Sequence, residues 1–279
     1  MSSLNPMVSV LMTVFNAEDH LRKALDSLSE QEYQDFEVVV LEHGSTDKSL
    51  QVLETWGDSR LVLKTMESNI GRTPALNDCL SRANGEFIAI LDADDIAHPR
   101  RFAAEVQYLK DNSDVGLVGT WSKFIDENDC SVGKSHPPIS HDKLIKQLAI
   151  RDPIVHSSVM FRCDIARAIG GYDNSFVYAQ DFRLIIDFAK RSKIAVINEE
   201  LCTWRKVASS LTSSKDLKIE RAFDEYRLFR SMSSELDFNS SLRLLNLKQR
   251  IITTSILKVA LLRSGEFTSI RKWRLRNGH

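Results

Sequence analysis

The 279-residue sequence has no apolar run close to the ~20 residues that a membrane-spanning helix needs. Its first seven residues lack the basic start and apolar core of a secretory signal peptide. Only four cysteines are present, and none is near enough to another in sequence to form a metal-ligand pair. These absences argue against a membrane-spanning or secreted protein and predict a reduced protein in the cytoplasm.

The composition is that of a soluble globular protein, but its charge is uneven. Hydrophobic residues make up 43% of the chain and charged residues 27%, enough for one large domain or two small ones. The net charge is −1, yet residues 215–279 hold 14 Lys and Arg against 7 Asp and Glu, which gives +7 and leaves −8 for residues 1–214. A basic tail that contains Trp273 indicates either contact with an anionic surface or a solvated helix end.

Short apolar segments alternate with amphipathic ones along the first 112 residues. Strands are predicted at 8–14, 36–41, 61–64 and 87–91, and helices at 17–30 and 73–83. Ser45 or Thr46 is expected to cap a further helix after the second strand. This alternation predicts a parallel sheet with helices on both faces, in which ligands lie beyond the carboxyl ends of the strands.

The pattern changes after residue 115. Strands are predicted at 115–120, 159–161 and 194–196, a loop at 170–173, an amphipathic helix at 181–190, and helix from residue 215 to the end. The predicted organisation is therefore one domain over residues 1–214, with halves of about 1–112 and 113–214, followed by a basic helical extension over 215–279.

Three carboxylates, Asp92, Asp94 and Asp95, follow directly on the buried strand at 87–91. Like charges at a strand end repel one another, so they need either a cation or full solvation. Oxygen ligands on a tight turn suit a hard ion such as Mg²⁺ or Mn²⁺, which also binds substrate phosphates. An isolated Asp-x-Asp is more often a solvated turn, but residues 13–16 and 42–47 are expected at the same edge of the sheet. That convergence favours a metal site.

These segments resemble the inverting nucleotide-sugar glycosyltransferases of family 2, of the bacterial surface-polysaccharide type. The resembling segments occur in the family's order over about residues 7–210, and they are 8–16, 36–47, 69–72 with Asn77, 85–95 with Pro99, 156–162, 170–173 and 180–181. The resemblance implies an α/β protein with the GT-A fold: a mixed, mostly parallel central sheet flanked by helices, with a C-terminal helical extension.

The resemblance assigns the acidic turn to a diphosphate-bound Mn²⁺ or Mg²⁺ ion. Asp94 would bind the ion directly, and Asp92 would bind it through a water molecule or hold the ribose. Asp95 would lie behind them, near the donor sugar. Arg72 is a candidate ligand of the diphosphate, with a surface arginine as the alternative.

A nucleotide-base pocket is implied at the ends of the first two strands. Thr13, Phe15 and Asn16 would line it, with the Phe15 ring stacked on the base. The family usually has two adjacent aspartates in the second loop, where this sequence has Glu42 and His43. A neutral imidazole also accepts a hydrogen bond from N3–H of uracil, so a UDP-sugar is still expected. The alternative for His43 is an exposed loop histidine without a role.

The second half of the sequence supplies a candidate general base. Asp181 matches the family's base position, although an Asp there could also be a helix N-cap. Gln180 precedes it where the family usually has Glu. His156 and Arg205 are assigned to the acceptor or a phosphate, with a structural histidine and an ion-paired arginine as alternatives.

The predicted function is transfer of a sugar, with inversion, from a nucleotide-diphosphate sugar to a glycan or lipid-diphosphate-linked acceptor. No nucleic acid is expected as a partner, and the basic tail would contact the inner face of the cytoplasmic membrane. A catalytically impaired relative that binds nucleotide or glycan is the first alternative. A sugar nucleotidyltransferase is disfavoured, because no Gly-rich loop follows the first strand.

Overall fold

The computed structural model describes residues 6–207, 218–236, 242–243, 246–251 and 253–254. The chain divides into two compact units, Met1–Val207 and Ala208–His279. The predicted boundary at residue 214 falls in the segment 208–217, which lies outside the described residues. Every sequence-predicted site residue lies in the first unit.

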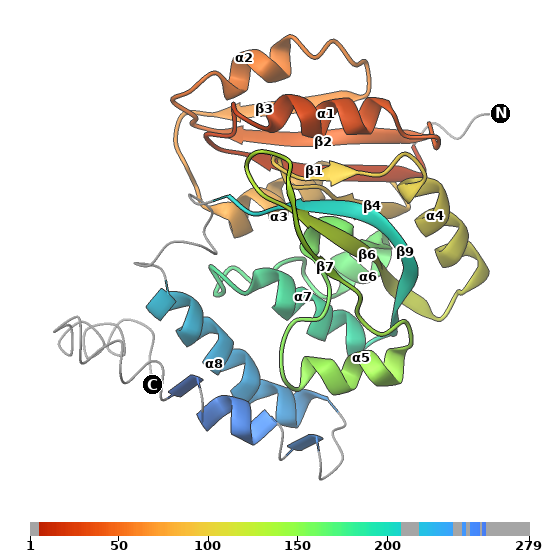
Figure 1. Ribbon diagram of the computed structural model, residues 1–279, viewed down its shortest axis with the longest axis vertical. Helices are drawn as coiled ribbons and strands as arrows, with labels where there is room; N and C mark the ends of the chain where they lie inside the picture. The colour runs from red at the N-terminus through yellow and green to blue at the C-terminus, as the bar shows by residue number, and fades with distance from the viewer. Residues whose placement is uncertain (1–5, 208–217, 237–241, 244–245, 252, 255–279) are drawn as a thin grey trace, which may run out of the picture. The chain divides into compact units, whose positions relative to one another are not determined.

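A mixed nine-stranded sheet, counted over the described residues, forms the centre of the first unit (Figure 1). Its order is β3-β2-β1-β4-β8-β6-β9-β5, and β7 pairs with β6. The first four strands in this order are mutually parallel, β8 is antiparallel to β4 and β6, and β9 is parallel to β6. The strands are β1 Val8–Val14, β2 Phe36–His43, β3 Leu61–Met66, β4 Phe87–Ile90, β5 Ile96–Ala97, β6 Val115–Ile125, β7 Ser131–Ser135, β8 Met160–Arg162 and β9 Lys193–Arg205.

Helices flank this sheet, as the sequence predicts. They are α1 Leu21–Ser29, α2 Ser49–Glu54, α3 Arg72–Arg82, α4 Arg101–Asp111, α5 His141–Leu148, α6 Cys163–Ala168 and α7 Gln180–Ala189, with a short 3₁₀ helix at His156–Ser158. Each longer helix buries one stripe; α1, for example, buries Leu21, Leu25 and Leu28 at a spacing of three to four residues. The mixed α/β architecture is therefore confirmed.

The central strands are buried on both faces, which explains their continuous apolar sequences. Val10, Met12 and Val40 have no exposed surface, and burial of such a side chain contributes roughly 2 kcal/mol. The parallel register pairs Val14 of β1 with Glu42 of β2, and Leu11 with Ile90 of β4. The carboxyl ends of β1, β2 and β4 thus lie at one edge, with the three functional segments after them.

The predicted cap of the helix after β2 is wrong. Helix α2 begins at Ser49, whose N–H donates to Oδ1 of Asp47 at 2.9 Å. Ser45 and Thr46 instead contact Asn16, because the turns after β1 and β2 are adjacent: N–H of Asn16 donates to Oγ of Ser45 at 3.0 Å, and N–H of Thr46 donates to Oδ1 of Asn16 at 2.9 Å. These side chains join two turns rather than start a helix.

The last strand is longer than predicted. The apolar pattern predicts a strand only at 194–196, but β9 extends to Arg205. It pairs with β6 along most of its length and with β5 near its end, so backbone pairing sustains it beyond the apolar residues. This extension brings Arg205 next to the acidic turn.

A buried arginine–glutamate pair lies directly beneath the end of β4. The guanidinium of Arg101 donates to the carbonyls of Ile90 and Val159, both at 3.0 Å, and its Nε is 3.2 Å from Glu105. Neither side chain has exposed surface. Burial raises the pKa of Glu105 to about 7, against the opposing effect of Arg101.

Stability should therefore fall as the pH rises through this range. The unfolded chain releases the Glu105 proton near pH 4.5, while the native state keeps it until about pH 7. Between these values the loss is on the order of 3 kcal/mol. In urea titrations at pH 5 and pH 7.5, Glu105→Gln should show a smaller pH-dependent loss than the unaltered protein. Equal losses in the two proteins would contradict the raised pKa.

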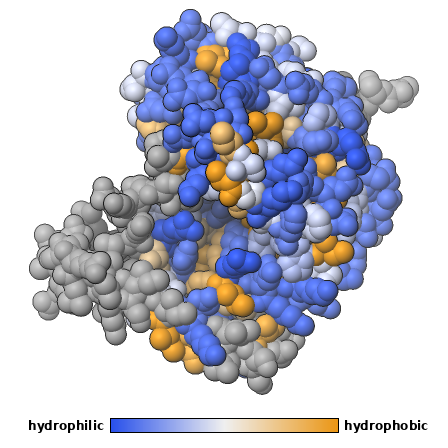
Figure 2. Space-filling view, in the orientation of Figure 1, coloured by the Kyte–Doolittle hydropathy of each residue, from blue (hydrophilic) through white to orange (hydrophobic). Residues whose placement is uncertain are grey.

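Of the predicted extension, the structure describes α8, Lys218–Glu235, and a few residues beyond it. The basic tail at 255–279 lies outside the described residues. Among the residues that are described, no helix combines the length and the apolar character needed to cross a bilayer. Figure 2 shows a mainly hydrophilic face, with hydrophobic residues in separate places and a hollow near its middle.

Candidate active site

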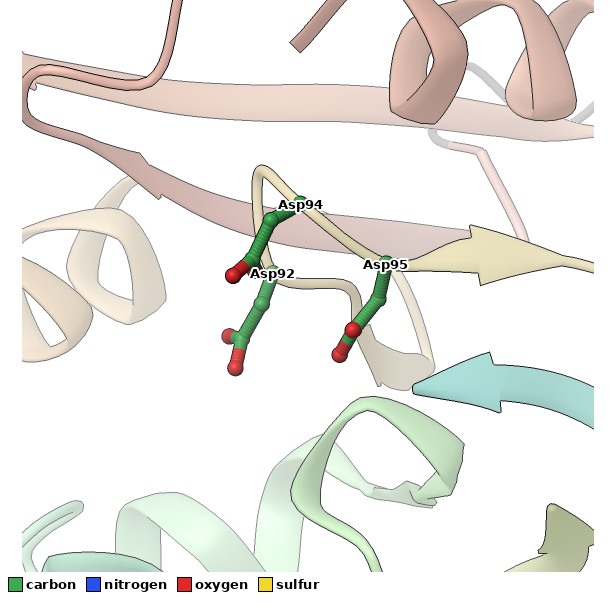
Figure 3. Close-up of side chains that lie close together, drawn as sticks. All are labelled: Asp92, Asp94 and Asp95. Atoms are coloured by element: carbon green, nitrogen blue, oxygen red, sulfur yellow. The ribbon is translucent and has the colours of Figure 1, made fainter. Parts of the chain in front are cut away.

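The three aspartates of the acidic turn lie close together. One carboxylate oxygen from each of Asp92, Asp94 and Asp95 lies within 4.8 Å of the other two. Figure 3 shows the Asp92 and Asp94 carboxylates side by side and directed the same way. The turn closes through N–H of Asp95, which donates to the Asp92 carbonyl at 3.2 Å, and N–H of Asp92 donates to Oγ of Ser157 at 3.1 Å. The strand end and these two bonds fix the cluster.

One arginine neutralises part of this charge. Arg72, the first residue of α3, donates through Nη2 to both oxygens of Asp92 at 2.6 Å. Burial is the largest single effect and opposes ionisation of Asp92, but Arg72, His156 and Ser157 together outweigh it, and the pKa of Asp92 is lowered. The preceding Gly71 has a φ of +86°, a conformation that glycine adopts without strain, and it directs the chain into α3.

The other two carboxylates are not compensated in the same way. Burial, and then the charge of Asp92, raise the pKa of Asp94 to about 6. Burial and its two acidic neighbours raise the pKa of Asp95 well above its usual range, and Oδ2 of Asp95 is buried without a hydrogen-bond partner. Excess negative charge on hard oxygen donors fits a Mg²⁺ or Mn²⁺ ion.

Arg72 also links the acidic turn to α7. Its Nη2 lies 3.2 Å from Nδ1 of His156, whose Nε2 lies 2.9 Å from the hydroxyl of Tyr172. With its amide oxygen directed towards Arg72, Gln180 accepts from Nε at 3.2 Å and donates to the carbonyl of Val177 at 3.1 Å. His156, Tyr172 and Gln180 are all buried. The guanidinium is thus held between the turn and the start of α7.

Asp181 lies beside this network and is partly exposed. It is the second residue of α7, and Ala179 occupies the N-cap position, so the capping alternative is wrong. Its Oδ1 accepts a hydrogen bond from N–H of Phe182 at 2.7 Å. Asp181 is close enough to Arg72 and His156 to contribute to the electrostatic field on both. A carboxylate is thus placed near the acidic turn on a separate element.

The turns after β1 and β2 bring the predicted base-pocket residues together. Phe15 is 40% exposed, unusually high for a large hydrophobic residue, and its ring is stacked on that of His43 at a centroid distance of 5.6 Å. Asn16 has a φ of +49° and bridges the two turns. Thr13 is partly buried on β1, and Oε1 of Glu42 accepts a hydrogen bond from N–H of Ser45 at 2.6 Å.

His43 is not the exposed loop histidine that the alternative supposed. It is only 4% exposed, because β2 continues through it to its last residue. Burial lowers its pKa, against smaller opposing effects of a hydrogen bond with Asn69 and the charge of Glu42. Its Nδ1 is buried without a hydrogen-bond partner. The imidazole is therefore neutral at pH 7, with one nitrogen unpaired.

Arg205 lies against the acidic turn, but protein groups enclose it. Its side chain has no exposed surface. Its Nε donates to the carbonyl of Asp94 at 3.0 Å, and its backbone N–H donates to Oδ1 of Asp95 at 2.7 Å. Nη1 is ion-paired with Asp129 at 2.6 Å. Arg205 is therefore an ion-paired arginine, which was the alternative to a role in contacting the acceptor or a phosphate.

The site contains residues that the sequence did not single out. Ser157 contacts the backbone of Asp92, Asn69 contacts His43, and Asp129 contacts Arg205. Ser157 and Asn69 belong to segments that carry the family resemblance, and this was the only available signal. Asp129 had none, because its contact depends on how a hairpin folds.

The sequence of this chain matches a known protein family. The model of the family described as "Glycosyl transferase family 2" matches residues 9–170, more than half of the chain. The chain belongs to glycosyl transferase family 2. The match spans the turns after β1 and β2, the acidic turn and His156. Asp181 and Arg205 lie beyond it.

Other glycosyltransferases are similar over most of the chain. An uncharacterized glycosyltransferase of Methanocaldococcus jannaschii is 32% identical over 206 residues, covering 72% of this chain and 71% of its own. The glucosyltransferase WfgD of Escherichia coli, named UDP-Glc:alpha-D-GlcNAc-diphosphoundecaprenol beta-1,3-glucosyltransferase, is 30% identical over 223 residues, covering 78% and 84%.

Solved structures show that the fold is the GT-A type expected for a glycosyltransferase of this family. Staphylococcus aureus TarS, in complex with UDP-GlcNAc, has a TM-score of 0.67 at 19% identity and covers 97% of this chain and 76% of its own. The mannosyltransferase PcManGT of Pyrobaculum calidifontis, in complex with GDP-Man and Mn²⁺, has a TM-score of 0.64 at 22% identity and covers 97% and 84%.

Proposed function

We propose that this family 2 glycosyltransferase transfers a sugar, with inversion, from a UDP-sugar to a lipid-diphosphate-linked acceptor. One observation carries the proposal: a single arginine connects the acidic turn to the start of α7, where a separate carboxylate, Asp181, lies. Arg72 contacts both Asp92 and the Gln180 side chain next to Asp181. Groups for the leaving diphosphate and for the attacking hydroxyl thus share one site.

The donor side of the site is the acidic turn. Asp94, with Asp92, would hold a Mn²⁺ or Mg²⁺ ion, which when bound offsets the charge that develops on the diphosphate. The Arg72 guanidinium adds a fixed positive charge beside the same place. Asp95 is buried and bonded to the backbone of Arg205, so it fixes the shape of the turn.

Asp181 would act as the general base. It removes the proton from the acceptor hydroxyl as that oxygen forms a bond to the anomeric carbon, and the bond from this carbon to the diphosphate breaks. Attack opposite the leaving group inverts the anomeric configuration. The partial exposure of Asp181 lets an acceptor reach it, while Gln180 is only 4% exposed.

His43 would select the base of the donor. Its Nδ1 has no partner, so the hydrogen bond with Asn69 involves Nε2. With the proton on Nε2, towards Asn69, Nδ1 would be left as an acceptor for the base. Uracil presents N3–H to such an acceptor, whereas cytosine has no proton on N3.

A uridine nucleotide should therefore bind more tightly than the matched cytidine nucleotide. Calorimetric titration with UDP and CDP in Mn²⁺ would measure the difference. His43→Ala should weaken UDP binding about tenfold, the effect of one lost hydrogen bond, and leave CDP binding unchanged. Affinity for UDP should also fall as acid protonates His43, at a pH below the ordinary histidine range because its pKa is lowered. Equal affinities for UDP and CDP would refute this role.

The acceptor class is proposed from relatives. WfgD and an Escherichia coli galactosyltransferase, 30% identical over 190 residues, are both named for GlcNAc-diphosphoundecaprenol acceptors. An acceptor of that kind is carried in a membrane. Action in the cytoplasm at the inner face of the membrane, with the basic residues of 255–279 against anionic lipid, follows from this class.

A further inference from the structure

We propose that Asp129, in the turn between β6 and β7, is a positioning residue for the acidic turn and acts through the guanidinium of Arg205. The inference rests on the proposed metal role of Asp94. It assigns a function in metal binding to a hairpin that contributes no ligand.

Arg205 holds the acidic turn from two directions. Its Nε donates to the backbone carbonyl of Asp94, and its own N–H donates to the side chain of Asp95. The first bond sets the peptide plane that follows Asp94, and the second anchors the next residue. A shift of Arg205 would therefore move the carboxylate of Asp94 relative to that of Asp92.

The position of Arg205 depends in turn on the hairpin. Nη1 donates to the carbonyl of Asp126 at 3.0 Å and to Oδ1 of Asp129 at 2.6 Å. Among the described residues, Asp129 is the carboxylate that forms an ion pair with this guanidinium. The Arg205 side chain is fully buried. Removal of its ion-pair partner would leave an uncompensated buried charge, which is unfavourable in the folded protein.

The hairpin turn is rigid enough for this role. Oδ1 of Asp126 accepts hydrogen bonds from N–H of Asn128 and of Cys130, both at 2.9 Å. N–H of Asp126 donates to the Cys130 carbonyl at 2.9 Å, which closes the turn. Asp129 itself has a φ of +64°, which Asp and Asn tolerate better than most residues. Its second oxygen binds Lys23 of α1.

Without the Asp129 charge, the guanidinium of Arg205 would still have the carboxylates of the acidic turn close by, because its Nε is bonded to the Asp94 carbonyl. Nη2 of Arg205 is already buried without a hydrogen-bond partner. The electrostatic effect of Arg205 also reaches Asp94. Rotation of the guanidinium towards Asp94 would put a positive charge where the metal ion is proposed to bind. Asp129 therefore keeps the metal position free of competition.

The test is a titration of the full chain with Mn²⁺ in the absence of nucleotide. Electron paramagnetic resonance measures the free Mn²⁺ at each step. Asp129→Asn keeps the shape of the side chain and tolerates the positive φ, so the turn is retained. It should raise the dissociation constant for Mn²⁺ about tenfold. This is the lower end of the loss in metal affinity seen when a residue that orients a metal ligand is replaced. Asp129→Glu, which restores a carboxylate, should lie closer to the unaltered protein than Asp129→Asn does.

Lys23→Met is the matched control, because it removes the other partner of Asp129 and leaves Arg205 paired. Its Mn²⁺ affinity should stay within about twofold of the unaltered protein. In transfer assays, Asp129→Asn should raise the KM for Mn²⁺ and keep kcat at saturating Mn²⁺. If Asp94→Asn loses Mn²⁺ binding and Asp129→Asn binds Mn²⁺ as the unaltered protein does, the role of Asp129 is overturned and the proposed metal role of Asp94 stands. Unchanged binding by Asp94→Asn overturns the proposed metal role and this inference with it.

Discussion

Replacement of Asp181 by Asn will remove sugar transfer and leave nucleotide-sugar binding intact. Asn has nearly the shape of Asp but cannot accept a proton, so the start of α7 is preserved while the proposed base is lost. General-base catalysis contributes roughly 10²- to 10⁴-fold, and kcat should fall by that factor. The change should be measured as product formed from a UDP-sugar and a lipid-diphosphate-linked acceptor, with UDP binding measured separately.

Asp187→Asn is the matched control on the same helix. Asp187 lies on another side of α7 and pairs with Arg183 and Lys190, so its loss affects helix stability rather than the site. This variant should transfer sugar normally. Full activity in Asp181→Asn would show that Asp181 is not the base. If the unaltered protein neither transfers sugar nor hydrolyses UDP-sugars with Mn²⁺, the impaired-relative alternative replaces the proposed function.

Replacement of Asp94 by Asn will remove the metal-dependent part of nucleotide binding. Within the part of the chain that the structure describes, Asp94 forms no ion pair, and it lies beside Asp92, so its carboxylate is available to a cation. A ligand at 100 times its dissociation constant stabilises a protein by about 2.7 kcal/mol. For a chain of this size that corresponds to a rise of roughly 5 °C or more in Tm. Mn²⁺ with UDP should give this rise in the unaltered protein and none in Asp94→Asn.

The surface variant Asp114→Asn serves as the control for this second prediction. Its carboxylate is exposed and pairs with Lys193, the first residue of β9, and Asp114 directly precedes β6 rather than β4 or the acidic turn. The variant should keep the Mn²⁺-dependent rise. A full rise in Asp94→Asn would exclude this residue as a metal ligand and leave Asp92 as the remaining candidate.

Local sequence predicted the elements whose signals are local. The apolar runs of β1, β2 and β4 predicted strands buried on both faces, since most of their positions are apolar or small; the exceptions are Glu37, Glu42 and His43 of β2. The amphipathic period predicted α7 within a residue of its start. The elements α4, α5, α6, β5 and β7 were not predicted. β5 and α6 are only two and six residues long and β7 is largely polar, whereas α4 was missed although it has 11 residues.

The site divides in the same way. The sequence by itself determined that three carboxylates end β4, that Phe15 and His43 end neighbouring strands, and that Asp181 begins α7. Only the tertiary structure decided that Arg72 pairs with Asp92, that His43 is buried, and that Arg205 is enclosed by protein. These contacts join residues that are far apart in sequence, from 20 positions for Arg72 and Asp92 to 111 positions for Arg205 and Asp94. Periodicity and turn propensity act over a few residues, whereas side-chain partners are chosen by how whole elements pack.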